Sequence, residues 1–578
     1  MKKNTFLVII VLLLLISFHL INNYIWLKLD CLFVYPNEIT NTVFHLESQM
    51  KFYRALKSLL DSDSLLFEKI KSFIMFFRPQ HVWPEHLWPG FMYCVTSIIN
   101  LLFGLTPFIT RFSNGLFLAI LIIFTYLIGK ACENKRAGLI AGFLISFYPG
   151  VFGISRLYDQ DFYLMAMVSV AVYLLIKAKK FTNKKYSILL GLFSGLGILT
   201  NGRFLIFTMG PLLYIVYLVF IGSRSSNSAD FFKQISNIVI SLLISLILSS
   251  VWWLGNFVLL DKALTHLLVG YLPDRYNLFG LKYDIFTMRS IFYHLAYLID
   301  HVSIYLFLLF FISLFWVRKK LNQHIRIILL WFFVPLAVFT LVSAKWEHYC
   351  FPILPSVAIL TAVGIERFTK RIKFAAILFL IILSLLQFFE ISYTFNFRPI
   401  KKMFSYNTAY WHPSIYNAPY KINNYENIIC EFSKDINNAM PRIPNAGDTG
   451  RLQVNLGVVD SISTAINDVL ISYYMRLHIQ SINIIGLPNG MPTVPNPSGV
   501  AEVFSKNINN FDFIVIVNNT SSPHIDFDGL DIPKELLTDY YYRRIINNIS
   551  EHWVIINKKI LMPDRKTIFL LGKDRSIL

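Results

Sequence analysis

Apolar runs of membrane-spanning length, separated by short polar loops, fill the first two thirds of the chain. A helix needs about 20 consecutive apolar residues to cross the hydrocarbon core of a bilayer. Runs of this kind predict transmembrane helices at residues 5–27, 110–130, 137–155, 162–178, 186–202, 204–222, 235–256, 291–316, 325–344, 349–367 and 373–395. The pattern indicates an α-helical, polytopic membrane protein with about eleven to thirteen transmembrane helices.

Two further features of the apolar runs need interpretation. Residues 87–108 contain Trp-Pro-Gly and Gly-Leu-Thr-Pro, which interrupt a helix, so this stretch is interpreted as interfacial or re-entrant. The N-terminal segment has a basic start and an apolar core, as a signal peptide has. Its apolar run continues through residue 27 without a small-residue cleavage site, which favours a retained anchor helix.

Lysine and arginine are distributed unevenly between alternate loops, and this asymmetry predicts the orientation of the helices. One set of loops carries clusters of them, at residues 2–3, 130–136, 177–185, 224–233, 318–326 and 367–373. The alternate short loops carry one each, namely Arg156, Arg203 and Lys345. The first set is therefore predicted to be cytoplasmic, so that the loops 28–109 and 257–290, and the chain after residue 396, face the outer side.

Composition supports a membrane protein and excludes several functional classes. The chain is 55% hydrophobic and only 15% charged, which is outside the usual range of soluble globular proteins. The net charge of +19 is largely the orientation signal, so no nucleic-acid partner is predicted. The five cysteines show no pairing pattern, so they predict no redox or metal role.

The last part of the chain, residues 399–578, lacks long apolar runs. Short apolar segments alternate with polar stretches there, and they include "LQVNLGVVD", "VLISYYMRLHI", "INIIGL", "DFIVIV", "HWVIIN" and "TIFLLG". This pattern is typical of a small α/β domain. The predicted organisation is a membrane module at residues 1–398, with interfacial helices in its outer loop 28–109, followed by a soluble α/β domain on the outer face.

Acidic residues at predicted outer helix ends are the first candidates for chemistry. Asp159 and Asp161 stand two residues apart at the start of an apolar run, so on a helix they lie on different faces and do not form a carboxylate pair. Each is either an N-cap or a functional charge at the membrane boundary. Glu38, in the first outer loop, is either a solvated carboxylate, a first-turn helix residue or a functional group.

Basic and hydroxyl groups gather at other outer helix ends. Lys345, His348 and Tyr349 precede a proline-containing apolar run. They form either an interfacial belt or a set of donors for a phosphate at headgroup depth. Arg203 and Arg275 add basic groups on the same predicted side.

Metal and nucleotide motifs are not evident in the sequence. His81, Glu85 and His86 lack the helical spacing of metal-ligating histidines, so no metal site is predicted, although a divalent cation is kept as an alternative cofactor. The chain contains no P-loop, no GxSxG and no dinucleotide-binding fingerprint.

The order of several segments resembles that of a known family. These segments are "YPNEI", "WPGFMYCVTSIINLLFGLTPFITRFSNGLF", "YLIGKACENKRAGLIAGFLISFYPGVFGISR", "DQDFYLMAMVSVAVYLL", "LLGLFSGLGILTNGRFLIF" and "AKWEHYCFPILPSVAIL". Over residues 1–370 they resemble the GT-C superfamily of membrane glycosyltransferases, in particular the protein O-mannosyltransferase (dolichyl-phosphate-mannose-protein mannosyltransferase) and lipid A aminoarabinose transferase group. The resemblance implies a polytopic GT-C fold.

The resemblance also implies the catalytic residues. Asn37 and Glu38 match the first-loop Asp-Glu motif of the family, with asparagine replacing the first acid. Asp161 matches a second acidic position of the family better than Asp159 does. Asp161 and Glu38 are therefore the catalytic candidates, and Asn37, Asp159 and His348 are candidates for orienting groups.

The donor site is implied in the same way. Lys345 and Tyr349 match the Lys-x-x-x-Tyr of the family and are implied to contact the phosphate of the donor. Arg203 and Arg275 are further candidates for this role.

The implied function is transfer of a sugar from a polyprenyl-phosphate carrier, as co-substrate, to a hydroxyl of a lipid, a protein or a glycan. An acceptor hydroxyl has a pKa far above 7, so it needs a carboxylate base, and direct displacement inverts the anomeric carbon. The predicted location is the outer face of a bacterial inner membrane, in contact with membrane lipids.

Three alternatives stay open at this point. A lipid-linked-sugar flippase or transporter is suggested by Asp300 and His301 inside a predicted span. An O-antigen ligase or polymerase shares lipid-linked substrates. A non-catalytic scaffold is suggested by Asn37, which stands where the family usually has an acid.

Overall fold

The computed structural model describes most of the predicted membrane module and the strands of the C-terminal part. The described residues are 3–29, 36–61, 68, 89–222, 228–253, 288–342, 347–393, 431–436, 438, 454–460, 482–486, 513–518, 553–561 and 566–573. The chain divides into two compact units, one comprising Met1–Lys28 and Ser48–Ala418 and the other Leu29–Glu47 and Pro419–Leu578. The predicted boundary was at residue 398, whereas this division falls after Ala418, and residues 29–47, predicted in the membrane module, group with the second unit.

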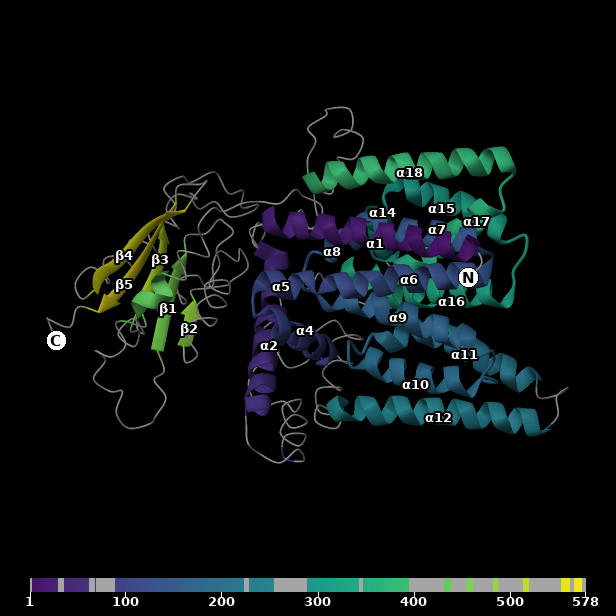
Figure 1. Ribbon diagram of the computed structural model, residues 1–578, viewed down its shortest axis with the longest axis horizontal. Helices are drawn as coiled ribbons and strands as arrows, with labels where there is room; N and C mark the ends of the chain where they lie inside the picture. Colours follow the sequence, from purple (N-terminus) through teal and green to yellow (C-terminus); the bar gives the residue numbers. More distant parts are fainter. Residues whose placement is uncertain are drawn as a thin grey trace. The chain divides into compact units, whose positions relative to one another are not determined.

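The first unit is built from helices, several of which run in nearly the same direction (Figure 1), and α2 is divided between the two units. The helices up to residue 198 are α1 (Lys3–Leu29), α2 (Pro36–Asp61), α4 (Phe91–Phe103), α5 (Pro107–Phe112), α6 (Asn114–Cys132), α7 (Lys135–Phe147), α8 (Pro149–Ile154), α9 (Gln160–Lys177) and α10 (Lys184–Ile198). The later helices are α11 (Phe204–Gly222), α12 (Ser228–Trp253), α14 (Met288–Val302), α15 (Ile304–Val317), α16 (Gln323–Leu341), the 3₁₀ helix η2 (Glu347–Ile353), α17 (Leu354–Glu366) and α18 (Lys370–Tyr393).

Each of the eleven predicted spans corresponds to helical structure. Among the described residues, eight helices are long and apolar enough to cross a membrane, or up to nine if one bent pair is counted as a single span. The predicted span 137–155 is divided between α7 and α8, and the span 186–202 contains the 15-residue α10. The multi-pass character predicted from the sequence is confirmed.

The predicted single span at 291–316 is wrong in one respect. Helices α14 and α15 meet at an angle of 110°, so this segment is not one straight helix. Ser303, between them, has φ 79° and ψ 146°, a conformation that lies outside a helix. The apolarity of the segment gave no sign of this break.

Helix α4 has thirteen residues, which is too short to span a bilayer, in agreement with the prediction for 87–108. It ends at Gly104, whose φ of 95° suits glycine. Thr96 on this helix hydrogen bonds to the hydroxyl of Tyr158 at 2.6 Å. Burial raises the pKa of Tyr158 well above its ordinary value, so the phenol stays protonated. The bond fixes α4 beside the segment that leads into α9.

Two helices form the centre of the first unit. In the most apolar stretch of α9 and of the segment His348–Glu366, 89% and 94% of the residues are buried. In that of α18, 33% of the residues are buried. A helix that is apolar on all sides is suited to such a central place. Helix α17 also approaches α15 closely, because a side chain at Gly364 would collide with Ser313. Helices α9 and α17 therefore form the closely packed centre of the unit.

The second unit contains a five-stranded mixed sheet, which fits the predicted α/β class (Figure 1). Its strands are β1 (Val454–Asp460), β2 (Ile482–Gly486), β3 (Phe513–Asn518), β4 (Trp553–Leu561) and β5 (Lys566–Lys573), in the order β2-β1-β3-β5-β4. β1 pairs in parallel with β2 and β3, while β5 is antiparallel to β3 and β4. The predicted segment "VLISYYMRLHI" lies outside the described residues.

Candidate active site

Asp159 caps the N-terminus of α9. Its Oδ1 accepts a hydrogen bond from the backbone nitrogen of Asp161 at 2.7 Å, and its own backbone is extended, as is usual for an N-cap. The structure therefore shows the capping alternative for Asp159. The cap places Asp161 in the first turn of α9, one of the two predicted positions for a functional charge.

Asp161 is buried and surrounded by basic groups. Its side chain is 3% exposed, and Arg203 Nη2 donates a hydrogen bond to Asp161 Oδ1 at 2.6 Å. The Nε2 of His348 lies 3.7 Å from Asp161 Oδ2. Since a buried carboxylate is costly without such partners, these three side chains form one electrostatic unit, here called the Asp161 cluster.

Three contacts fix Arg203, through its backbone nitrogen, its Nε and the plane of its guanidinium group. It stands directly before α11, and Asn201 Oδ1 accepts hydrogen bonds from its backbone nitrogen at 3.0 Å and from its Nε at 3.3 Å. The ring of Tyr349 lies under the guanidinium, 4.6 Å from Cζ to the ring centroid. A guanidinium stacked on an aromatic ring gains cation–π stabilisation and a fixed plane.

Tyr349 is itself fixed by the helices around it. Its ring lies 5.1 Å from Phe339 of α16 and 6.4 Å from His294 of α14, between ring centroids, and it is nearly buried. His348 meets the ring of Tyr349 edge-on at 5.2 Å. Residues from η2, α14 and α16 thus support the Asp161 cluster.

A chain of amides connects the cluster to Pro89, two residues before α4. Asn201 Nδ2 donates to Gln160 Oε1 at 3.3 Å, and Gln160 Nε2 donates to the carbonyl of Pro89 at 3.4 Å. Sequence reasoning missed Asn201 and Gln160. The signal was weak, since Asn before Gly202 is typical of a turn and Gln160 stands between two more prominent acids.

The structure brings together Asp161, Arg203, His348 and Tyr349 of the predicted site residues. Asn37 and Glu38 lie in the first turn of α2, and their side chains are outside the described set. The other predicted site residues, Lys345 and Arg275, lie outside the described residues, as do His81, Glu85 and His86, for which no site was predicted.

Arg156, predicted only as an outer charge, is a buried connector. Its Nε donates to Asn23 Oδ1 at 3.2 Å and its Nη2 donates to Ser392 Oγ at 2.8 Å. The rings of Trp26 and Phe152 lie 5.0 Å and 5.2 Å from its Cζ. Arg156 therefore links α1 and α18 to the loop before α9.

Ion pairs of a different kind join the loops predicted to be cytoplasmic. Arg367 Nη2 lies 2.7 Å from Glu133 Oε2, and Lys373 Nζ lies 3.1 Å from Glu366 Oε2. Asn134 Nδ2 also donates to Glu366 at 3.2 Å. Residues from different loops predicted to be cytoplasmic thus contact one another. Residues predicted to lie on the outer side contact one another at the Asp161 cluster.

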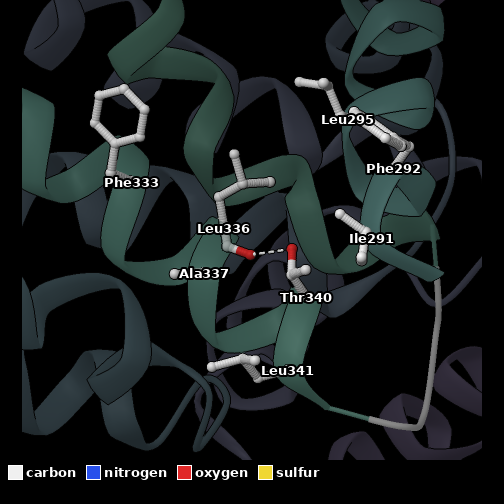
Figure 2. A pocket seen from close by; sticks show the side chains of 8 residues that line it. All are labelled: Ile291, Phe292, Leu295, Phe333, Leu336, Ala337, Thr340 and Leu341. Atoms are coloured by element: carbon white, nitrogen blue, oxygen red, sulfur yellow. Dashed lines mark hydrogen bonds between the residues drawn. The ribbon is translucent and has the colours of Figure 1, made fainter. Parts of the chain in front are cut away.

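A groove of about 430 Å³ lies between α14 and α16 (Figure 2). Its lining is apolar apart from one hydroxyl, and consists of Ile291, Phe292, Leu295, Phe333, Leu336, Ala337, Thr340 and Leu341. The hydroxyl of Thr340 donates to the carbonyl of Leu336 at 2.7 Å, so it is satisfied within the helix. The same two helices contribute His294 and Phe339 to the surroundings of Tyr349, so the groove and the Asp161 cluster share two supporting helices.

Comparison with protein families gives a partial match. Residues 89–253 match a family described as dolichyl-phosphate-mannose-protein mannosyltransferase. This segment contains α4 to α12 and includes Asp161, Asn201 and Arg203. An uncharacterised protein of Aquifex aeolicus is 23% identical over 309 residues, which are 53% of this chain and 58% of the Aquifex protein. The match therefore spans less than two thirds of that relative.

Comparison of folds covers nearly the whole chain. ArnT from Cupriavidus metallidurans, in a crystal structure with bound undecaprenyl phosphate, aligns with a TM-score of 0.56 at 12% identity, over 96% of this chain and 97% of ArnT. Its apo structure aligns with a TM-score of 0.55 at 13% identity over the same shares. The predicted fold is confirmed by this likeness to ArnT, and the family match over residues 89–253 agrees with the resemblance seen in the sequence.

Proposed function

We propose that this chain is a membrane glycosyltransferase that transfers a sugar from a polyprenyl-phosphate carrier to a hydroxyl acceptor. The observation that carries this proposal is the buried Asp161 cluster, in which an arginine and a histidine meet a carboxylate at one end of a membrane bundle. The fold shared with ArnT, a protein whose crystal structure contains undecaprenyl phosphate, supports this choice of carrier.

Arg203 supplies positive charge that a donor phosphate needs, and His348 lies beside it as a further hydrogen-bonding group. Hydrogen bonds from a guanidinium to phosphate are charge-assisted and strong, especially in a site shielded from water. Arg203 is only 9% exposed, and its Nη1 has no hydrogen-bond partner among the described residues. Lys345 and Arg275 are proposed to complete the phosphate site.

The lipid part of the donor is proposed to lie in the groove between α14 and α16. Its lining is almost entirely apolar, as an isoprenoid chain requires (Figure 2). Since His294 and Phe339 of the same helices surround Tyr349, a lipid in the groove would have its phosphate close to Arg203.

Transfer needs a base for the acceptor hydroxyl. Glu38 and Asp161 are the two proposed bases, and the Oδ2 of Asp161 is the oxygen that does not pair with Arg203. The acceptor oxygen attacks the anomeric carbon while the bond from that carbon to the phosphate oxygen breaks. The proton passes to the carboxylate, the lipid phosphate leaves with its negative charge, and the anomeric carbon is inverted.

The location of the reaction follows from the orientation of the helices. The lysine-rich and arginine-rich loops support an outer-face position for the Asp161 cluster, and a bacterial inner membrane is proposed. The C-terminal sheet is proposed to face the same side. The acceptor hydroxyl belongs to a lipid, a protein or a glycan.

The experiment compares purified wild type, Asp161→Asn and Glu38→Gln. Each protein is incubated with a panel of radiolabelled polyprenyl-phosphate sugars and an envelope extract. Transfer of label by wild type, and its loss in a variant that keeps its thermal unfolding midpoint, would support the proposal and rank the two carboxylates. Absence of transfer from every donor would favour a transporter or a scaffold.

A further inference from the structure

We infer that Asn201 is a positioning residue that orients Arg203 so that its Nη1 is presented to the donor phosphate. This inference rests on the proposed function and adds to it a residue that does not itself contact the donor. It comes from the distribution of hydrogen bonds around the guanidinium, which is unequal between the three nitrogens.

Two of the three guanidinium nitrogens of Arg203 are already engaged. Nε donates to Asn201 Oδ1 at 3.3 Å, and Nη2 donates to Asp161 Oδ1 at 2.6 Å. Nη1 is buried and has no hydrogen-bond partner within the described part of the chain. A buried donor without a partner is costly, which makes Nη1 a prepared site for an anionic oxygen.

The side chain of Asn201 is itself fixed, so it can impose an orientation on the guanidinium of Arg203. Its Oδ1 accepts from Arg203 and its Nδ2 donates to Gln160 Oε1. Because the amide uses both ends in this way, it has a defined orientation. Gln160 is held in turn by the carbonyl of Pro89. The direction of Nη1 is therefore determined by contacts that reach from the segment before α4 to the segment before α11.

A purely local role of Asn201 is the competing explanation. Its Oδ1 also accepts from the backbone nitrogen of Arg203, which is a common turn contact of asparagine. The contact with Nε goes beyond such a turn, because it involves the side chain of Arg203. The two roles therefore predict different behaviour when Arg203 is removed.

The test measures binding of undecaprenyl phosphate to full-length protein in detergent. Asn201→Leu removes both hydrogen-bonding ends of the amide, and a weakening of about tenfold is expected, the value of one lost bond to a charged group. Asn201→Asp keeps the acceptor for Arg203 and is expected to restore most of the affinity. Thr200→Val is the matched control, because Thr200 is buried next to Asn201 and its hydroxyl donates to the carbonyl of Leu196 in its own helix turn.

A double-mutant cycle separates positioning from a structural role. In an Arg203→Ala background, Asn201→Leu is expected to cause no further loss of affinity, since Asn201 acts through Arg203. Additive losses, or equal losses in Asn201→Leu and Asn201→Asp, would overturn the role of Asn201 while leaving the proposed function intact. No binding by wild type would instead overturn the donor site itself, and this role with it.

Discussion

Arg203 and Asp161, forty-two positions apart in the chain, form a hydrogen-bonded ion pair of 2.6 Å at the start of α9. The side chains are 9% and 3% exposed, so water screens this pair little. Arg203 thereby joins the N-terminal end of α11 to the N-terminal end of α9. The pair is both a structural connection and the charged centre of the candidate site.

Removing one member of this pair is expected to destabilise the protein. Asp161→Leu leaves Arg203 as a buried charge with a weaker set of partners, at an expected cost of about 3–5 kcal/mol in the free energy of unfolding. Asp161→Asn keeps an oxygen acceptor for Nη2 and is expected to cost less. Unfolding in detergent, followed by circular dichroism, measures both variants.

Asp159→Asn is the matched control for the Asp161 variants. It also removes one negative charge, two residues away, but asparagine caps a helix about as well as aspartate does. Its unfolding free energy is expected to stay within about 0.5 kcal/mol of wild type. A cost as large as that of Asp161→Leu would show that net charge, and not the bond to Arg203, determines stability here.

Substitutions of Tyr349 separate its ring from its hydroxyl. If the ring supports Arg203, Tyr349→Phe keeps the affinity for lipid phosphate, whereas Tyr349→Leu loses the cation–π contact, worth about 1–2 kcal/mol in a desolvated site. If the hydroxyl contacts the phosphate, as the family resemblance implies, Tyr349→Phe also weakens binding. Dissociation constants for undecaprenyl phosphate distinguish the two outcomes.

Much of this arrangement could be predicted from the sequence, because apolarity and charge act over whole segments. The span positions and the lysine and arginine asymmetry placed Asp161, Arg203 and His348 on one side of the bundle. The hydrogen-bond partners of Arg203 could not be predicted. The pairing of its Nη2 with Asp161 and of its Nε with Asn201 depends on the rotation of each helix about its axis. The break at Ser303 was also invisible, since serine carries no general preference for a positive φ.

Arg156 is expected to contribute to stability without taking part in the reaction. Arg156→Met removes the hydrogen bonds to Asn23 and Ser392 but keeps an apolar side chain among the rings of Trp26 and Phe152. A loss of about 1–3 kcal/mol is expected from the buried polar groups left without Arg156. Unfolding free energies measure this loss, and an unchanged KM for the donor below the unfolding transition is the accompanying expectation. A raised KM without loss of stability would place Arg156 in the donor site instead.

Narrowing the groove between α14 and α16 tests whether it holds the lipid chain. Ala337→Phe adds a ring to the lining of the groove, on α16 (Figure 2). If the added ring excludes two or three methylene groups of the lipid from the groove, the lost burial is about 0.8 kcal/mol for each group. The dissociation constant for undecaprenyl phosphate then rises about ten- to fiftyfold. A donor analogue with a short prenyl chain is expected to be affected less, because it makes fewer of these contacts.

The control for this substitution is Leu243→Phe, at an exposed apolar position of α12 outside the groove. It adds similar apolar surface to a face of the bundle without narrowing the groove, so affinity for both chain lengths is expected to stay at the wild-type value. Equal weakening of long-chain and short-chain ligands by Ala337→Phe would point to a disturbed Tyr349, because α16 carries both Ala337 and Phe339. Unchanged binding of both ligands would place the lipid chain elsewhere on the bundle.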